Sequence, residues 1–304
     1  VVERTRKQAA ADHPGLISYD SVAKLLADAA IELVVVNTPN ATHFELARQA
    51  LLAGKHVLVE KPVCITVAEL DELLALAARC GLHLLAYQNR RYDSDFQLVR
   101  QVVASGQLGE LVEAHFRFER YKLPLNVKTF KEDPAVPGSG LLYDLGPHVL
   151  DQALLLFGRP QRVRKTLASH RPDSRVDDYF HLHLTYPGGL NVFVTGSLLA
   201  ADPGPAYELH GTRGSFRNPR ADPQEAQLLQ GLTPTTPTYG QEPAAQEGVL
   251  TLVQDDGTKT QTLLPAPPGA YPALFEAVFH TLRGQHPFPI RAGELRWQLE
   301  VLGM

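Results

Sequence analysis

Short apolar runs alternate with helix-like segments through the first hundred residues, and this order restricts the possible fold more than any other feature. The runs lie at 31–36, 56–59 and 82–87. Between them, residues 42–53 have helical periodicity, and a second helix is predicted from Thr66, which forms a capping-box pattern with Glu69, to about Gly81. Continuous apolar strands separated by amphipathic helices indicate a parallel sheet packed between helices. The first half is therefore predicted to be a doubly wound α/β domain.

The pattern changes after about residue 110. Apolar and polar residues then alternate in four segments, 111–118, 179–185, 190–197 and 258–264. Tyr186-Pro187-Gly188-Gly189 between two of them is a hairpin signal. Alternation of this kind predicts an antiparallel sheet and an α+β domain, with helices near 271–282 and 292–302 and a long loop over 217–247. The chain of 304 residues is long enough for two domains, which we place at 1–110 and 111–304.

Composition excludes several classes of function. Lys and Arg number 29 against 33 Asp and Glu, so no basic surplus is present to neutralise a nucleic-acid backbone. No apolar stretch is long enough for a membrane span. The two cysteines, Cys64 and Cys80, are too few for a disulfide framework and are expected to be buried apolar residues of a cytoplasmic protein.

Polar, turn-forming residues follow each predicted parallel strand. They are Asn37–His43, Glu60-Lys61-Pro62 and Gln88-Asn89-Arg90-Arg91. In a doubly wound sheet, ligands bind outside the carboxyl ends of the strands. Each segment alone could be an ordinary turn, but three together favour a binding edge.

A fourth segment, Gly138 to Asp151, reads GSGLLYDLGPHVLD. Pro147 suits the first turn of a helix, so His148 is expected near a helix N-terminus, where the dipole disfavours imidazolium. A neutral imidazole is what a general base requires, although Asp144 and His148 could equally form a capping arrangement.

The ordered set TPNATH (38–43), EKP (60–62), YQNRR (87–91) and GSGLLYDLGPHVLD resembles the Gfo/Idh/MocA oxidoreductases, over essentially the whole chain. Segments 176–180 and 210–216 are similar to a subgroup that contains NADP-dependent scyllo-inositol dehydrogenases. The resemblance implies a Rossmann domain followed by an α+β domain with a large, mostly antiparallel sheet.

The resemblance also implies the chemistry: hydride transfer between a secondary hydroxyl of a sugar or cyclic polyol and nicotinamide. Lys61, Asp144 and His148 match the family's catalytic positions. These three residues and Tyr121 are the expected substrate contacts in this chain. His148 would take the hydroxyl proton, Lys61 would stabilise alkoxide charge, and Asp144 would bind a neighbouring hydroxyl and orient His148. Lys122, Lys128 and Lys131 flank a loop before the Asp144 segment and could contact the substrate, but a solvated surface is favoured for them.

Cofactor contacts are expected from a set of residues at the strand ends: Glu3, Arg4, Asn37, Thr38, Pro39, His43, Glu60, Lys61, Gln88 and Arg90. Glu3 favours NAD by binding the ribose diol, whereas the cations that follow it favour NADP. NADP is preferred because the subgroup resemblance agrees with it. No metal is expected, although His181 and His183 lie on one strand face.

One departure from the family concerns the phosphate-binding loop. No G-x-G-x-x-G occurs in the sequence, and the chain opens with Val1-Val2 instead of Met. We expect that native residues carrying this loop precede Val1; the competing interpretation is a truncated domain that binds dinucleotide poorly.

Function classes besides a sugar or polyol dehydrogenase stay open at this point. They are a non-catalytic dinucleotide-binding regulator, a family member acting on a dihydrodiol or a biliverdin-like substrate, and redox-dependent glycoside cleavage. Whichever applies, the resemblance implies a homodimer or homotetramer through the C-terminal sheet.

Overall fold

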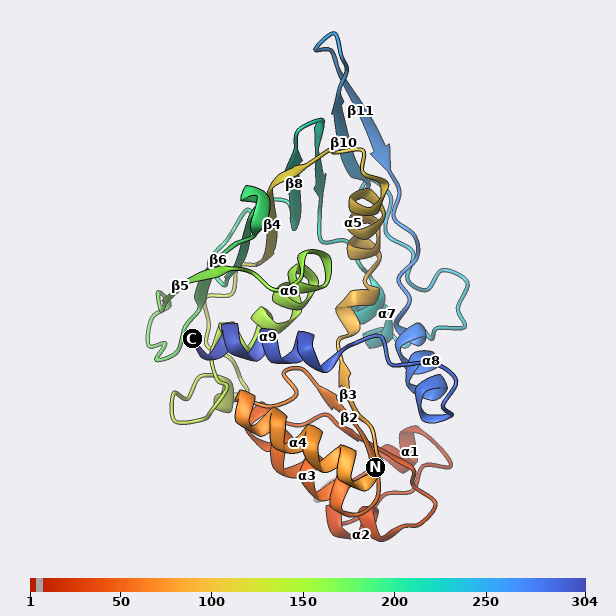
Figure 1. Cartoon of the computed structure of the whole chain (residues 1–304). Helices are drawn as coiled ribbons and strands as arrows, with labels where there is room; N and C mark the ends of the chain where they lie inside the picture. The colour runs from red at the N-terminus through yellow and green to blue at the C-terminus, as the bar shows by residue number, and fades with distance from the viewer. Residues whose placement is uncertain (4–7) are drawn as a thin grey trace. The chain divides into compact units, whose positions relative to one another are not determined.

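The computed structural model describes residues 1–3 and 8–304 and separates by its contacts into two compact units, Val1–Tyr87 and Gln88–Met304 (Figure 1). The helix α5 (Ser94–Ser105) belongs to the second unit, because Phe96 packs on Tyr207 with ring centroids 6.1 Å apart. The contacts therefore divide the chain before α5, whereas the predicted domain boundary at residue 110 follows it.

The first unit is built on a parallel sheet in the order β1-β2-β3. These strands are β1 (Leu33–Val36), β2 (His56–Glu60) and β3 (Leu84–Tyr87). The helices α3 (His43–Leu52) and α4 (Val67–Cys80) pack on each other, α3 against β1 and β2 and α4 against β3 (Figure 1). Two shorter helices are α1 (Ala9–Asp12) and α2 (Val22–Ala27). The parallel α/β fold predicted for this half is confirmed.

Local signals in the sequence fix the ends of α4. Thr66 accepts a hydrogen bond from the Glu69 N–H, and the Glu69 carboxylate accepts one from the Thr66 N–H. Gly81 ends the helix in the left-handed conformation at φ 66°.

Cys64 is buried, and burial raises the pKa of its thiol to about 12. Cys80 is exposed, so the expectation that it is buried was wrong.

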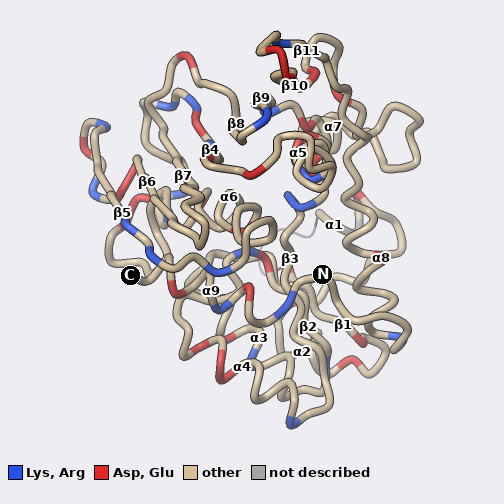
Figure 2. Tube along the Cα trace, turned by 45° about the horizontal axis from the view of Figure 1, so that its top comes forward, with Lys and Arg blue, Asp and Glu red and all other residues tan. Residues whose placement is uncertain are grey.

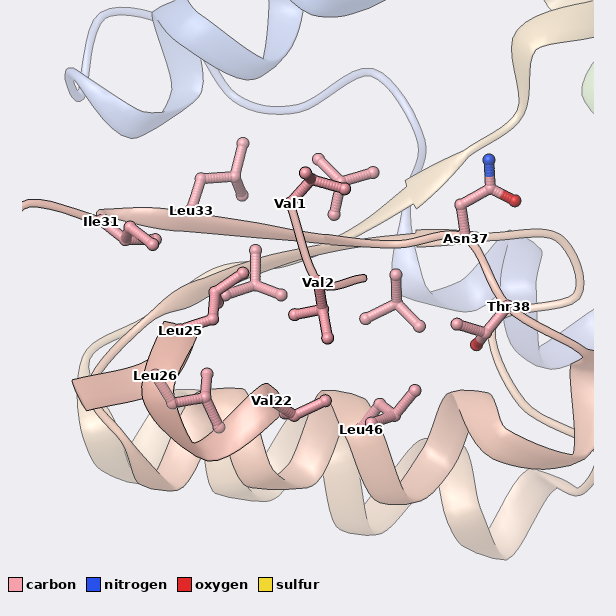
Figure 3. Close-up of a pocket in the computed structure, with 13 residues that line it drawn as sticks. Val1, Val2, Val22, Leu25, Leu26, Ile31, Leu33, Asn37, Thr38 and Leu46 are labelled. Carbon is pink, nitrogen blue, oxygen red and sulfur yellow. The ribbon is translucent and has the colours of Figure 1, made fainter. Parts of the chain in front are cut away.

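An apolar hollow of about 610 Å³ lies beside β1 within the first unit (Figure 3). Val2 stands in it, facing Val22, Leu25 and Leu26 of α2. Val2 forms a parallel bridge with Tyr19. The strand β1 pairs with β2. At one end of the hollow stands Asn37, next to Thr38.

The second unit contains an eight-stranded sheet in the order β11-β10-β9-β8-β4-β7-β6-β5. Its strands are β4 (Leu111–Glu119), β5 (Arg162–Ala168), β6 (Tyr179–Thr185), β7 (Asn191–Ser197), β8 (Tyr207–Gly211), β9 (Gly214–Asn218), β10 (Gly248–Val253) and β11 (Lys259–Leu264). In this sheet, as described over residues 88–304, β4 and β7 pair in parallel and the remaining pairs are antiparallel. The predicted mostly antiparallel sheet is therefore confirmed.

One long helix, α6 (Leu141–Phe157), packs across β4, β6 and β7 and against α9 (Ala292–Gly303). Further helices of this unit are α7 (Gln224–Leu229) and α8 (Tyr271–Leu282), with single 3-10 turns η2 (Asn89–Tyr92), η3 (Thr129–Lys131) and η4 (Pro187–Gly189); η1 (Asn40–Thr42) lies in the first unit. Phe116, Phe180 and Val194 alternate inward along their strands and are fully buried. They form the core beneath α6.

The strand residues of opposite parity face away from that core. On this face Phe193 of β7 stacks with His115, His181 and His183, at centroid distances of 4.9, 5.6 and 4.7 Å. His181 bonds to Thr195 and His183 to Asn191, and the described residues contain no group of three His, Cys, Asp or Glu that could hold a metal. Association of two or four copies through this face stays a prediction.

Lys and Arg are interspersed with Asp and Glu along the chain (Figure 2). None of the helices in the described ranges has both the length and the apolar character that a membrane span requires.

The segment predicted as a loop over 217–247 starts within β9 and contains α7, and it is anchored to the residue that begins α5. The Ser94 N–H donates to Asp222 at 2.7 Å, and the Ser94 hydroxyl donates to Glu242 at 2.7 Å. Burial raises the pKa of Glu242 to about 7; the Ser94 hydrogen bond opposes this, and repulsion from carboxylates such as Asp95 adds to it. Hydrogen bonds from Ser94 to two half-buried carboxylates thus hold the segment in place.

This raised pKa gives the stability a defined pH dependence. Because folded Glu242 binds its proton more tightly than the unfolded chain does, its contribution to the free energy of unfolding should fall as the pH rises from about 4.5 to 7 and then level off. The variant Glu242→Gln should therefore gain thermal stability over the wild type across this range. Unfolding temperatures at pH 5, 6, 7 and 8 measure the difference, with Glu276→Gln on the exposed side of α8 as the control. A constant offset at all four pH values would contradict the assignment.

Candidate functional site

Two loops lie side by side at the carboxyl ends of β1 and β2. The register pairs Val36 with Val59, so Asn37 and Glu60 stand next to each other where the loops begin. Asn37, Thr38 and Pro39 are exposed, and Glu60 and Lys61 are half-buried. This is the edge at which a doubly wound sheet binds ligands. The structure brings these predicted residues together.

His43 ties the two loops to each other. It is fully buried; its Nδ1 lies 2.7 Å from the Pro62 carbonyl and its Nε2 lies 2.8 Å from the Thr38 carbonyl. Burial lowers the pKa of His43, and the two carbonyls oppose that shift. Both ring nitrogens are therefore engaged by backbone. Any effect of His43 on a cofactor passes through the positions of Thr38 and of the loop after Lys61.

The acidic residue at the start of the chain is also engaged locally. One carboxylate oxygen of Glu3 accepts hydrogen bonds from the N–H groups of Gln8 and Ala9, at 3.0 and 2.9 Å, and the other accepts one from the Ser18 hydroxyl at 2.7 Å. The predicted cofactor residue Arg4 lies outside the described residues.

In the second unit, the N-terminus of α6 is held by Asp177. The Asp177 carboxylate accepts a hydrogen bond from the Leu142 N–H at 2.6 Å, and its backbone carbonyl accepts one from the Leu141 N–H at 2.9 Å. Burial raises the pKa of Asp177. The close approach depends on Gly140, whose φ is 85° and where an added Cβ would stand 2.1 Å from an Asp177 oxygen.

Gly140 and Gly158 flank α6 and give a matched pair of substitutions. Both adopt backbone conformations that only glycine tolerates well, but of the two only Gly140 has a neighbour within 4 Å of an added Cβ. Gly158→Ala should lower the free energy of unfolding by about 1–3 kcal/mol through backbone strain, and Gly140→Ala should cost more, because it also displaces Asp177. Denaturant titration measures the free energy of unfolding of both variants. Equal losses in the two would show that displacing Asp177 does not destabilise the protein.

Asp144 and His148 lie one turn apart on α6, so both side chains project from the same side of the helix. Lys131 donates a hydrogen bond to Asp144 at 2.6 Å, and its backbone carbonyl accepts one from the Gly140 N–H. His148 is 7% exposed. Lys131, for which a solvated surface was favoured and a substrate contact left open, is partly exposed and pairs with a predicted catalytic carboxylate.

The prediction for Pro147 was also wrong. The helix begins at Leu141, so Pro147 lies in its second turn and not in its first. His148 is therefore well inside α6, beyond the first turn to which the field of the helix N-terminus is confined. A neutral His148 therefore cannot be argued from the dipole of α6.

An ion-pair network anchors the same helix farther along. Arg91 donates to both oxygens of Asp151 at 2.7 Å and to Glu294 of α9 at 2.8 Å. All three side chains are buried. Arg91 and Asp151 occur in two of the quoted motifs, but no role was predicted for either. Their pairing shows that these motifs together hold the helix that carries His148.

Other predicted site residues of the second unit lie elsewhere. Gln88 is buried and donates to Gln298 of α9 at 3.3 Å. Arg90 pairs with Asp93 at 3.1 Å and with Glu225 of α7 at 2.8 Å. Tyr121 is 58% exposed, and its neighbours in the chain, not Tyr121 itself, line the hollow beside Asp144.

The chain matches two models of one protein family. Residues 2–88 match the model described as oxidoreductase family, NAD-binding Rossmann fold, and residues 96–217 match the C-terminal domain model of the same family. The chain belongs to the Gfo/Idh/MocA family. It is thus an NAD(P)-binding oxidoreductase by family, and the resemblance predicted from the four motifs is confirmed.

Relatives extend over nearly the whole chain. The oxidoreductase YdgJ of Escherichia coli K12 is 39% identical over 96% of this chain and 83% of its own length. The scyllo-inositol 2-dehydrogenase (NADP(+)) IolW of Bacillus subtilis is 32% identical over 93% and 78%. Among solved structures, the oxidoreductase YPO2259 of Yersinia pestis superposes with a TM-score of 0.90 at 37% identity, covering 97% of this chain and 82% of that one.

The residues present fit one part of a dinucleotide. The polar loops after β1 and β2 supply an exposed amide at Asn37, hydroxyls at Thr38 and Thr42, and the Lys61 ammonium at the ligand-binding edge. No glycine-rich cradle for a pyrophosphate occurs in the sequence. The amide, hydroxyl and ammonium groups of the two loops are hydrogen-bond donors and acceptors that suit the polar groups of a dinucleotide.

Proposed function

We propose that this protein transfers a hydride between a secondary hydroxyl of a sugar or cyclic polyol and NADP(H), with Lys61, Asp144 and His148 at the reacting carbon. The observation that carries the proposal is the motif pair: Glu60-Lys61-Pro62 at the carboxyl end of a parallel strand, and Asp144 one turn before His148 on α6. A bound nicotinamide accepts or supplies the hydride.

The chain's own residues handle the proton and the charge. His148 takes the proton of the reacting hydroxyl during oxidation and returns it during reduction. The Lys61 ammonium donates a hydrogen bond to the same oxygen and stabilises its developing negative charge. Asp144 accepts a hydrogen bond from the neighbouring hydroxyl, which fixes the ring relative to His148. Lys131 donates a hydrogen bond to Asp144 at 2.6 Å, which orients that carboxylate.

The relatives support a ring that carries adjacent hydroxyls. IolW is named for scyllo-inositol, and a relative from Bos taurus, 30% identical over 68% of this chain and 61% of its own length, is named trans-1,2-dihydrobenzene-1,2-diol dehydrogenase. Both names describe six-membered rings with neighbouring hydroxyl groups. A carboxylate one turn from a histidine suits such a pair, because one hydroxyl reacts while the other is held. A non-sugar diol is therefore the second candidate substrate.

NADP is the proposed cofactor. The name of IolW supports it, as do the cations Arg4, Arg6 and Lys7 in the sequence. The Glu3 carboxylate, bonded to three donors of its own segment, is less available for a ribose diol.

The experiment follows absorbance of reduced nicotinamide with NADP⁺ or NAD⁺ against inositols, aldoses and a dihydrodiol. A rise with one alcohol that Lys61→Ala abolishes supports the proposal. Dinucleotide binding without turnover of any of these alcohols would overturn it and favour a regulator.

A further inference from the structure

We infer that the substrate carries an anionic group, a carboxylate or a phosphate, bound by Arg120 and Lys122 next to Asp144. The inference rests on the proposed function in one respect: it takes Asp144 as the residue that holds the substrate ring. It goes beyond that function because both compounds in the relatives' names are neutral.

The site is a small hollow within the second unit, which we call the Asp144 hollow. Arg120, Lys122, Lys131, Asp144 and Arg171 are among the residues that line it. Its free volume is about 20 Å³, close to that of one bound water. A carboxylate or phosphate oxygen therefore enters only at its mouth, where the longer cationic side chains can reach it.

Most charges that line the Asp144 hollow are already neutralised. Arg171 pairs with Glu132 at 2.8 Å and with Asp178 at 3.3 Å, and Lys131 pairs with Asp144. By contrast, no side-chain hydrogen bond or ion pair of Arg120 or Lys122 occurs among the residues that the structure describes. Two cations with no counter-ion in the described part of the chain thus face a hollow whose carboxylates are engaged.

The backbone holds these two cations in a fixed register. The Arg120 N–H donates to the Ser197 carbonyl at 3.0 Å and the Lys122 N–H to the Leu198 carbonyl at 2.7 Å, while Tyr121 forms an antiparallel bridge with Leu199. Side chains two residues apart on an extended strand point to the same face, roughly 7 Å apart. This separation lets a guanidinium and an ammonium contact different oxygens of one anion.

Arginine and lysine in this arrangement recognise an anion better than a neutral hydroxyl. A guanidinium binds carboxylate or phosphate through paired N–H groups, and an ammonium adds a point charge. On the inward face of the same strand, Phe116 and Phe118 continue the apolar core, so the cations mark where that face becomes a binding surface. An acidic sugar or a phosphorylated polyol fits: its ring hydroxyls reach Asp144 and its anion reaches Arg120 and Lys122.

Binding measured without turnover tests this directly. Isothermal titration with glucose, glucuronate and glucose 6-phosphate, and with myo-inositol and myo-inositol 1-phosphate, compares neutral and anionic forms of the same ring. At least one anionic sugar or polyol should bind about tenfold more tightly than its neutral parent, and Arg120→Gln or Lys122→Gln should remove that advantage. Glucuronate and the two phosphates separate the carboxylate from the phosphate source. Lys128→Gln, an exposed lysine of the same loop that does not line the hollow, should bind like the wild type.

Turnover separates failure of this inference from failure of the proposed function. An increased KM for the anionic substrate in Arg120→Gln, with kcat and the KM for the neutral ring unchanged, supports the subsite. Equal binding of neutral and anionic rings overturns the inference, even if a neutral alcohol is oxidised. Anion binding that depends on Arg120 and Lys122 but leads to no oxidation keeps the subsite and overturns the proposed function.

Discussion

Replacing His148 with asparagine is expected to lower kcat for alcohol oxidation by about 10²–10⁴-fold, the usual contribution of a positioned acid–base group. Asparagine keeps a polar side chain of similar reach on α6 but cannot take the proton. Because His148 is 7% exposed and lies one turn after Asp144, it is placed for a substrate held by that carboxylate. Steady-state kinetics measures the loss, and fluorescence of bound reduced nicotinamide should show dinucleotide affinity within about twofold of the wild type.

The control is His286→Asn, which changes an exposed histidine that follows α8. It should keep wild-type kcat, and thermal unfolding of both variants establishes that each is folded. Wild-type turnover in His148→Asn would contradict the assignment of the base. A loss of dinucleotide affinity equal to the loss of kcat would instead make His148 a binding residue.

The elements that sequence predicted well are those whose signal is local. Thr66 and Glu69 form their capping box within four residues, and Tyr186 to Gly189 join β6 and β7 as the hairpin signal requires. Strands β5, β8, β9 and β10 were not predicted. Three of the seven residues of β5, Arg162, Arg164 and Lys165, are charged, so its sequence does not alternate between apolar and polar residues.

Pro147 illustrates a local rule that tertiary context overrode. Proline prefers the first helical turn because its missing N–H is not needed there. In α6, Gly140 and Asp177 set the beginning of the helix two turns earlier, through a contact between residues 37 positions apart in the chain. Nothing in the sequence around Pro147 encodes that contact. The preference of proline for the first helical turn could therefore not predict the residue at which α6 begins.

The residues of the candidate site also differ in whether a local pattern predicts them. Lys61, Asp144 and His148 were found because they stand inside short motifs. Arg120 was not singled out, and a solvated surface was favoured for Lys122 and Lys131, because the positions of all three beside Asp144 depend on the loop and on the pairing of Tyr121 with Leu199. Charged residues in a loop are usually solvated, and no local pattern marks the ones that face inward. Only the fold distinguishes Lys131 from Lys128.

Replacing Arg91 with methionine is expected to lower the free energy of unfolding by about 3–5 kcal/mol, the cost of leaving a buried charge without its partner. Methionine fills most of the volume of the arginine stem, so the loss reports mainly on charge. Glu294 keeps hydrogen bonds from Arg291 at 2.6 and 2.8 Å, whereas Asp151 loses both of its bonds to Arg91. The uncompensated group is therefore Asp151, three residues after His148. Denaturant titration followed by circular dichroism measures the change.

The chain offers a matched control and a second variant. Arg159→Met breaks an ion pair with Glu300 whose side chains are 60% and 34% exposed, and such a pair contributes only about 0–1 kcal/mol. Combining Arg91→Met with Asp151→Asn removes the stranded carboxylate, so the double variant should be more stable than the sum of the single losses predicts. Additive losses, or a loss in Arg91→Met no larger than in Arg159→Met, would show that water reaches Asp151. The network would then stabilise α6 no more than a surface ion pair does, and the position of His148 would depend on the packing of α6 against the sheet and α9 and on the Asp177 contacts at its N-terminus.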